Sequence, residues 1–332
     1  MMTFASLRRS ICSVIALLAA TSAAAEEGPA SWSISDLKAA YEDVDDGRVF
    51  VVAHRGCWAA APENSVAAIE ACVRLGVEAV EIDVQMTGDG ALVVFHDTTL
   101  KRMTNAYGYV GDKTLAELRE YRLYERDGSP AQQFNRPILT NMPIATLEEV
   151  FEAARGRLMI NLEIKSNHAA GFVKTFGAAV ALAKELGVED HVFWKIPPSV
   201  RGRAGPEDRA DARYNSVETS GLSYVMPIVW ESERGFEKQL EDFDAAGLTA
   251  FEIVSVDLDY WPVGRDGRIL GADRNRYMMV GVLPRWAGGL SDDVAAADPE
   301  AVWGRMINLG ADLIMTDRPE RLLRYLEETG RR

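Results

Sequence analysis

The chain has 332 residues, of which 48% are hydrophobic and 26% charged, and its formal net charge is −14. This is the composition of a globular protein that can bury a substantial core, and no long low-complexity tract interrupts it. So acidic a chain is a poor binder of nucleic acid or of an anionic membrane surface, and we expect no nucleic-acid partner.

The first residues have the order of a secretory signal peptide. Arg8 and Arg9 precede an apolar run at 11–20, and small residues follow up to Ala25, after which we place the cleavage. The apolar run is shorter than the ~20 residues that span a bilayer, so we expect no stable membrane anchor. The mature chain, 26–332, is predicted to be exported, to the periplasm or outside the cell. Its formal net charge falls from −14 to −16 because the signal peptide contains two arginines.

Apolar, β-branched runs alternate with amphipathic segments along the mature chain. Strands are predicted at 50–53, 79–84, 92–95, 158–164, 191–196, 223–229, 251–256, 277–283 and 312–315, and helices at 66–75, 147–155, 170–186, 233–246, 299–309 and 319–328. Near-continuous apolar strands separated by helices indicate an α/β fold with a parallel sheet covered by helices. About eight such units indicate a closed (β/α)8 barrel, the TIM-barrel fold, and one of the nine runs is then an insertion or edge element.

Two segments depart from this alternation. The stretch TGDG at 87–90 is a turn signal, and it leaves no room for a crossover helix between the second and third strands. We therefore expect a hairpin, which brings His96 towards Glu81. The second segment, about 101–143, is rich in Tyr, Arg, Gly and Pro, and it predicts a small insertion or lid after the third strand, within one barrel domain at 26–332.

Carboxylates gather at the carboxyl ends of the predicted strands, where barrel enzymes place their active sites. Glu81 and Asp83 point to the same side of one strand, and Glu163 alternates with Asn161 and Lys165 on another. Like charges on one face repel unless a cation lies between them. Three convergent carboxylates predict a site for Ca²⁺ or Mg²⁺, although a lone Glu-x-Asp is more often a solvated face or an ion-pair partner.

Histidines and basic residues flank these carboxylates. His54 ends the first strand and His96 the third, and two histidines beside a cation predict a general acid and a general base. Arg55 and Lys165 offer fixed positive charge to an anionic substrate. A cation, an acid–base pair and an anion-binding group together suit phosphoryl chemistry.

The remaining histidines and the cysteines of the mature chain have no such setting. We expect His168 and His191 on the surface or in loops. An exported protein can join Cys57 to Cys72 in a disulfide. However, Cys72 stands at helical spacing on a face directed to the core, where free thiols are common, so both states stay open and the free thiols are favoured.

Several motifs resemble the glycerophosphodiester phosphodiesterase family in order and spacing: AHRG, APENS, VEIDVQMTGDGALVVFHD, TLKRMTN, NLEIKS and GADLIMTDRPE. The resemblance runs from about residue 48 to 326, and LSDDVAAADPEAVWGRMINLGADLIMTDRP further resembles a secreted bacterial branch. It implies a TIM barrel with an insertion after the HD strand, and hydrolysis of glycerophosphodiesters to an alcohol and glycerol phosphate through a cyclic phosphate. It also implies metal ligands at Glu81, Asp83 and Glu163, an acid–base pair at His54 and His96, phosphate contacts from Arg55 and Lys165, and a position close to the site for Glu63.

Some features leave alternatives open. Glu63 also reads as a helix-start carboxylate with Ser65 as the N-cap. VGVLPRW replaces a Trp-Thr-Val-Asn stretch of many family members, and Lys195 either meets a second anionic group or lies on the surface. The same chemistry on lysophospholipids or inositol phosphodiesters, a barrel glycosidase with paired carboxylates, and a non-catalytic phosphoester-binding protein are the rival readings. The oligomeric state is not predicted.

Overall fold

The computed structural model describes residues 32–43, 47–125, 138–166, 169–196, 221–230, 248, 250–254, 263, 265–269, 271–272, 276–281 and 291–332. The predicted signal peptide, the predicted helix at 233–246, His168 and Trp286, the last residue of VGVLPRW, lie outside these residues. Within the part of the chain that is described, no helix combines the length and the apolarity needed to cross a bilayer.

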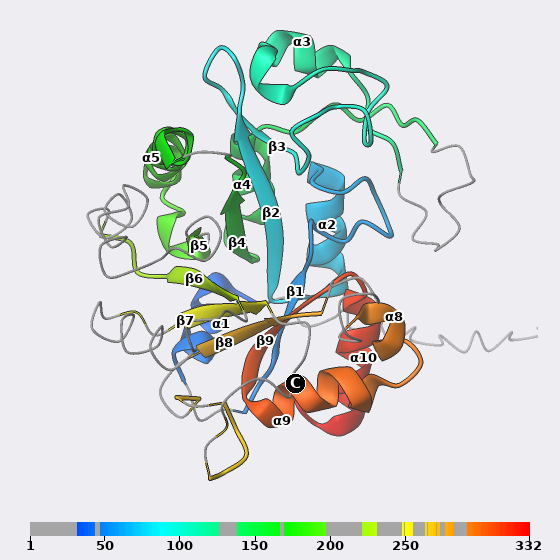
Figure 1. Cartoon of the computed structure of the whole chain (residues 1–332), viewed down its shortest axis with the longest axis vertical. Helices are drawn as coiled ribbons and strands as arrows, with labels where there is room; N and C mark the ends of the chain where they lie inside the picture. The colour runs from blue at the N-terminus through cyan, green and yellow to red at the C-terminus, as the bar shows by residue number, and fades with distance from the viewer. Residues whose placement is uncertain are drawn as a thin grey trace, which may run out of the picture.

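Eight parallel strands close into a barrel in the described residues (Figure 1). These eight strands and one further strand, β3, are β1 Phe50–Ala53, β2 Ala79–Met86, β3 Leu92–Val94, β4 Met159–Ile164, β5 Val192–Ile196, β6 Val225–Trp230, β7 Ala250–Val254, β8 Arg276–Val280 and β9 Ala311–Thr316. β1 closes the barrel because it pairs in parallel with both β2 and β9. The predicted (β/α)8 fold is confirmed.

β3 is the extra strand. It pairs antiparallel with β2, with Val84 opposite Val94 and Met86 opposite Leu92, so the turn at 87–90 forms the predicted hairpin. Thr87 stabilises the turn, since its backbone N–H donates to the carbonyl of Ala91 at 2.9 Å. The hairpin places His96, which follows β3, beside the carboxyl end of β2.

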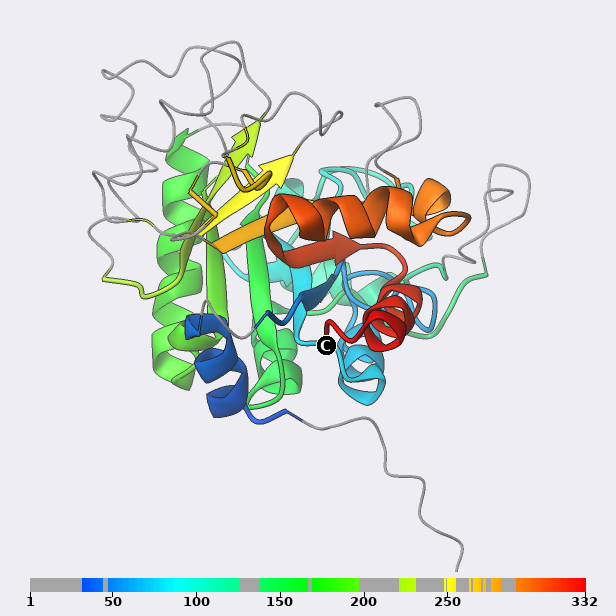
Figure 2. The ribbon, with the colours of Figure 1, turned by 90° about the horizontal axis from the view of Figure 1, so that it is seen from below.

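Helices cover the outside of the barrel, as Figure 2 shows for α2, α5 and α10. The helical segments are α1 Ile34–Glu42, α2 Val66–Leu75, η1 Val110–Asp112, α3 Leu115–Glu120, α4 Leu147–Ala154, α5 Ala169–Leu186, η3 Glu189–His191, α8 Asp292–Ala295, η7 Glu300–Gly304, α9 Arg305–Leu309 and α10 Pro319–Thr329. The predicted helix at 299–309 is a π-helical turn, η7, that continues into α9. His191 is buried at the end of η3, directly before β5, so its predicted surface position is wrong.

Apolar side chains pack on both sides of the strands. The larger cluster lies between strands and helices and includes Ile69, Val80 and Phe151. A second cluster joins inward-facing strand residues to α1, whose Tyr41 ring is 4.8 Å from that of Phe193. α1 packs against the interior of the barrel where the strands begin. The polar residues of the interior lie at the opposite end of the barrel, where the strands end.

The segment after β3 forms a small unit of its own. η1 and α3 lie in it, and its core includes Val93, Phe95, Leu100, Leu118 and Ile144. In Figure 1 this unit lies around α3, at the end of the molecule beyond β2 and β3. The described part of 101–143 therefore agrees with an insertion after the third strand, and its action as a lid stays a prediction.

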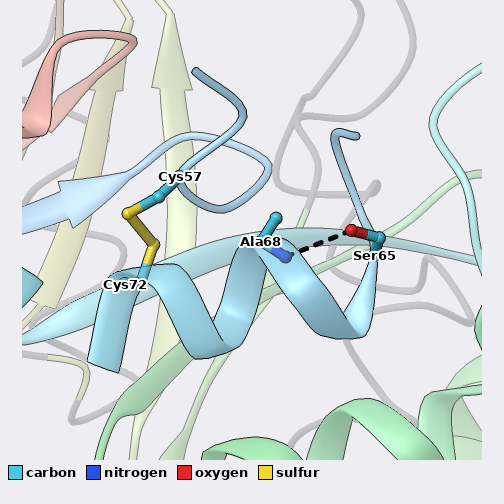
Figure 3. The surroundings of a disulfide bond; sticks show 4 residues. All are labelled: Cys57, Ser65, Ala68 and Cys72. Atoms are coloured by element: carbon cyan, nitrogen blue, oxygen red, sulfur yellow. Dashed lines mark hydrogen bonds between the residues drawn. A yellow bond between two sulfur atoms is a disulfide. The ribbon is translucent and has the colours of Figure 1, made fainter. Parts of the chain in front are cut away.

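A disulfide joins Cys57 to Cys72, with their Cα atoms 5.2 Å apart (Figure 3). Our preference for free thiols is therefore wrong. Cys72 does face the core, but the loop after β1 turns back onto that same face of α2. Gly56 permits this approach, since it has a φ of +80° and an added Cβ would lie 3.0 Å from the Cβ of Ala68. Ser65 caps α2 as predicted, accepting a hydrogen bond from the Ala68 backbone N–H.

Candidate active site

Three carboxylates converge inside the barrel at the carboxyl ends of its strands. Glu81 and Asp83 lie on β2, and Asp83 is the register neighbour of Glu163 on β4. One carboxylate oxygen from each of the three residues lies within 4.8 Å of the others. The structure thus brings together the three acidic residues that the sequence singled out.

The carboxylate cluster, Glu81, Asp83 and Glu163, fits a hard divalent cation. All its donor atoms are oxygens, the kind that Ca²⁺ and Mg²⁺ bind. Asp83 Oδ1 is buried and accepts no hydrogen bond from the described residues, although the Lys165 ammonium lies 3.1 Å away. A buried oxygen without a hydrogen bond is costly unless a positive charge faces it. The cluster is therefore built to sit beside cations.

Burial and neighbouring charges act against each other in this cluster. Burial raises the pKa of Glu81, and the charge of Asp83 raises it further. Burial acts in the same direction on Asp83, but Lys165, Arg55 and His96 together outweigh it and the pKa of Asp83 falls below its usual range. Burial likewise opposes ionisation of Glu163, whose pKa is nevertheless lowered by Lys195 and Lys165. Asp83 and Glu163 are therefore anionic at neutral pH.

His54 follows β1 and is held by Asp317, which directly follows the last strand, β9. Its Nδ1 lies 2.9 Å from Asp317 Oδ1, and Trp58 donates its indole N–H to the same oxygen at 2.7 Å. Asp292 in turn accepts hydrogen bonds from the Thr316 hydroxyl and from the Asp317 backbone N–H. Burial lowers the pKa of His54, against the effect of the Asp317 hydrogen bond. With Nδ1 engaged, Nε2 is the nitrogen left for a substrate.

His96 has the same arrangement on the other side. Its Nδ1 lies 2.6 Å from Asp97 Oδ1, and Arg102 Nε donates to Asp97 Oδ2, also at 2.6 Å. Gln85 fixes the backbone here, since its side-chain amide donates to the carbonyl of Asp97. Both histidines interact electrostatically with Asp83. The hairpin thus brings His96 towards the carboxylates of β2, as expected.

Arg55 is held in a strained backbone conformation beside the cluster. Its φ is 57°, in the left-handed region, which costs a residue other than glycine about 1–3 kcal/mol. Its backbone N–H donates to Glu81 Oε2 at 3.0 Å, and its guanidinium Nε is 3.6 Å from Asp83 Oδ2. Backbone strain that other contacts maintain is typical of functional sites.

Glu63 and Lys165 complete the set of predicted site residues. Glu63 is buried and accepts hydrogen bonds from Arg55 at 3.2 Å and from Arg102 at 2.6 and 3.0 Å. It therefore does more than begin a helix, because it joins the loop after β1 to the segment after β3. Lys165 Nζ lies 2.5 Å from Glu163 Oε1.

Several polar residues of this site received no role from the sequence: Asn64, Asp97, Glu252 and Asp317. Lys195 is buried inside the barrel, so a surface position is wrong for it. Glu252 is buried on β7, where it is the single glutamate within the apolar strand AFEIV; unlike Glu81, it has no second acid on its strand to draw attention to it. Asp317 belongs to the motif GADLIMTDRPE, but only its pairing with His54 gives it a role.

Comparison with known proteins places the chain in a family. The model of the glycerophosphoryl diester phosphodiesterase family matches residues 54–195, and a model described only as a domain of unknown function matches residues 225–326. A glycerophosphodiester phosphodiesterase of Bacillus altitudinis is 37% identical over 292 residues, covering 84% of this chain and 98% of that protein. The chain belongs to the glycerophosphodiester phosphodiesterase family.

Other curated members of the glycerophosphodiester phosphodiesterase family match a shorter stretch. One from Caldanaerobacter subterraneus is 39% identical over 120 residues, covering 36% of this chain and 46% of that protein. One from Bacillus subtilis is 33% identical over 119 residues, covering 36% of this chain and 41% of that protein. In these matches the chain spans less than half of each relative's length.

Solved structures of such phosphodiesterases share the barrel. One from Parabacteroides distasonis superimposes with a TM-score of 0.63 at 21% identity, covering 91% of this chain and 94% of that one. A phosphodiesterase from Oleispira antarctica, in complex with the product sn-glycerol-3-phosphate, gives 0.59 at 20% identity, covering 86% and 99%. At this level of identity the likeness shows the fold.

Proposed function

We propose that this protein hydrolyses glycerophosphodiesters to an alcohol and glycerol phosphate. The observation that carries the proposal is the carboxylate cluster with two histidines beside it, each held through Nδ1 by an aspartate. The identity with the Bacillus altitudinis enzyme over 84% of the chain supports the same reaction class, that of the phosphoric diester hydrolases. The product complex of the Oleispira antarctica phosphodiesterase supports glycerol phosphate as the product.

Glu81, Asp83 and Glu163 would hold the divalent cation, Ca²⁺ or Mg²⁺. When bound, such an ion supplies positive charge that neutralises a phosphoryl oxygen and acidifies a nearby hydroxyl. Arg55 and Lys165 add fixed positive charge for the phosphodiester, with Glu63 orienting the Arg55 guanidinium.

His54 and His96 move the protons in this proposal. One takes the proton of the attacking glycerol hydroxyl through Nε2 as its oxygen bonds to phosphorus, and the other gives a proton to the alcohol as its bond to phosphorus breaks. Water then opens the resulting cyclic phosphate to glycerol phosphate, with the two histidines exchanging roles. Asp317 and Asp97 hold each ring and favour the tautomer with hydrogen on Nδ1, which leaves Nε2 to serve as the base. The other ring must carry a proton on Nε2, and its aspartate stabilises that imidazolium.

The geometry argues against the glycosidase alternative. Glycosidases separate two carboxyl groups by about 5–9.5 Å to accommodate a sugar, and they need no lysine between the acids. Here the three carboxylates come within 4.8 Å of one another, and Lys165 contacts both Asp83 and Glu163. A cation site explains this crowding better than a sugar site.

Export to the periplasm or outside the cell is part of the proposal. It rests on the order of charged, apolar and small residues in the first 25 positions, and the Cys57–Cys72 disulfide supports an oxidising compartment. The substrate would be a small phosphodiester. Fractionation of cells that produce the full-length chain, followed by mass determination of the mature protein, tests the export and the cleavage site.

The test of the reaction is alcohol release from a panel of glycerophosphodiesters, with and without a chelator. We expect release that the chelator stops, that Ca²⁺ or Mg²⁺ restores, and that a Glu81→Ala variant lacks. His54→Ala and His96→Ala should each lose about 10²–10⁴-fold in turnover. Near-normal turnover in both variants would contradict the mechanism, and release from lysophospholipids alone would keep the chemistry but change the substrate.

A further inference from the structure

Lys195 is a buried cation to which the proposed reaction gives no role. It extends from β5 into the barrel and is only 3% exposed. Its Nζ donates to Glu163 Oε2 at 2.8 Å and lies 3.0 Å from Glu252 Oε2 on β7. A third carboxylate, that of Glu81, is 3.9 Å away. The ammonium therefore touches two members of the carboxylate cluster and one acid outside it.

Lys195 differs from Lys165 in the oxygen of Glu163 that it binds. Lys165, which also contacts Asp83, contacts Oε1, whereas Lys195 contacts Oε2. Lys165 is about one-fifth exposed at the mouth of the barrel, while Lys195 is enclosed by β4, β5 and β7. The two ammonium groups therefore act on Glu163 from different sides, and a cation held by the carboxylate cluster would still face the charge of Lys195.

Glu252 is not a member of the carboxylate cluster, but its charge acts on the cluster through Lys195. Its carboxylate and that of Glu163 share the ammonium, at 3.0 and 2.8 Å. Charges a few Å apart interact strongly in a buried site. Lys195 therefore lowers the negative charge that Glu163 presents to a cation, and Glu252 offsets part of that effect.

We propose that the Lys195–Glu252 ion pair sets the affinity of the carboxylate cluster for its divalent cation. Lys195 weakens cation binding by sharing Glu163, and Glu252 strengthens it by sharing Lys195. The inference rests on the proposed cation site at Glu81, Asp83 and Glu163. It makes Lys195 and Glu252 positioning residues, since neither needs to touch the cation or the substrate.

The experiment is calorimetric titration of the mature protein with Ca²⁺ and with Mg²⁺, in the absence of substrate. Lys195→Met removes the ammonium at similar length, and we expect cation affinity to rise, on the order of tenfold. Glu252→Gln keeps the shape of the side chain but removes its charge, and we expect affinity to fall by a similar factor. The double variant restores the charge balance and should bind within about threefold of the wild type.

The opposite signs separate a charge effect from structural damage. If the pair only supports the fold, both single variants weaken cation binding and lower the melting temperature, and the inference is wrong. Unchanged affinity in all three variants also overturns it. If the wild type itself binds neither cation, the proposed cation site fails and not merely this inference. Should Lys195→Met fail to fold, Glu252→Gln and the double variant still decide, because weakening in the first must be reversed in the second.

Discussion

Each histidine of the site is oriented by a carboxylate from a different part of the chain. Asp97 is the immediate neighbour of His96, whereas Asp317 is 263 positions from His54. The two pairs also differ in support, because Asp97 is held by Arg102 and Asp317 by Trp58. The pair at His54 is therefore the one that depends on the closing of the barrel.

Replacing Asp317 tests whether the His54 ring needs this partner. Asp317→Asn keeps the shape of the side chain but removes its charge, so the imidazolium form of His54 loses its stabilisation. We expect kcat to fall on the order of 10²-fold with a smaller change in KM. Trp58→Phe, which removes only the indole hydrogen bond to Asp317, is the control and should reduce kcat much less. A kcat for Asp317→Asn within twofold of the wild type would show that Asp317 does not orient the ring.

Glu252 and Asp317, which the sequence did not assign, and Lys195, whose partner it left open, all act through contacts with a distant strand. Lys195 and Glu252 meet across the barrel from β5 and β7, and Asp317 reaches His54 from the strand that closes the barrel. Residue patterns predict which face of a strand a side chain occupies, but not which side chain of a distant strand it meets. Glu81 and Asp83 could be paired from the sequence because they stand on one strand.

The sequence predicted the bounds of most of the described strands within about two residues, because these strands have a strong apolar pattern. It predicted α2 at its observed bounds. α1 was missed because Leu37 and Tyr41 are its only buried residues among nine, too few for a helical apolar stripe. Its signal is local instead: Ser33 and Asp36 form a capping box at its start.

The loop from β1 to α2 is the element on which most of the site depends. It carries Arg55, Glu63 and Asn64, and Arg55 and Asn64 both have left-handed backbone conformations. Asn64 also donates its amide to Asp83 Oδ2 at 2.8 Å. A loop with such strained residues needs restraint, and the Cys57–Cys72 disulfide anchors it to α2.

Removing the disulfide should weaken both the fold and the site. For a separation of 15 residues, the restraint on the unfolded chain is worth about 3 kcal/mol. We expect the Cys57→Ala/Cys72→Ala variant to lose stability of this order in urea unfolding and to have reduced turnover. Dithiothreitol should bring the wild type towards the same values and leave the variant unchanged. Full turnover by the reduced protein would mean that packing alone holds the loop.

At the scale of the whole molecule, a buried carboxyl group couples the fold to pH. Glu78 precedes β2 and is fully buried, with its Oε2 accepting from the Val51 backbone N–H at 2.9 Å and its Oε1 3.7 Å from Arg332 Nε. Burial raises the pKa of Glu78 to about 7, against both of these contacts. The folded protein therefore binds this proton more tightly than the unfolded chain, so Glu78 makes stability fall as the pH rises from about 4.5 to about 7.

Glu78→Gln should remove this dependence. Relative to the wild type, we expect the variant to gain up to about 3 kcal/mol in the free energy of unfolding between pH 4.5 and pH 8. Urea unfolding of both proteins at the two pH values measures it. Glu327→Gln is the matched control, because Glu327 binds the same Arg332 at 2.8 Å but is exposed. A pH profile for Glu78→Gln that runs parallel to that of the wild type would contradict the assignment.

The contact between His54 and Asp317 also determines when the active site can form during synthesis of the chain. A ribosome adds about 5–20 residues per second, so the 263 residues between the two take roughly ten seconds or more to translate. Until then the nascent chain carries a histidine without its aspartate and a barrel without its closing strand. The active site is therefore incomplete while the chain is being made, and it is completed only when the last strand and Asp317 are in place.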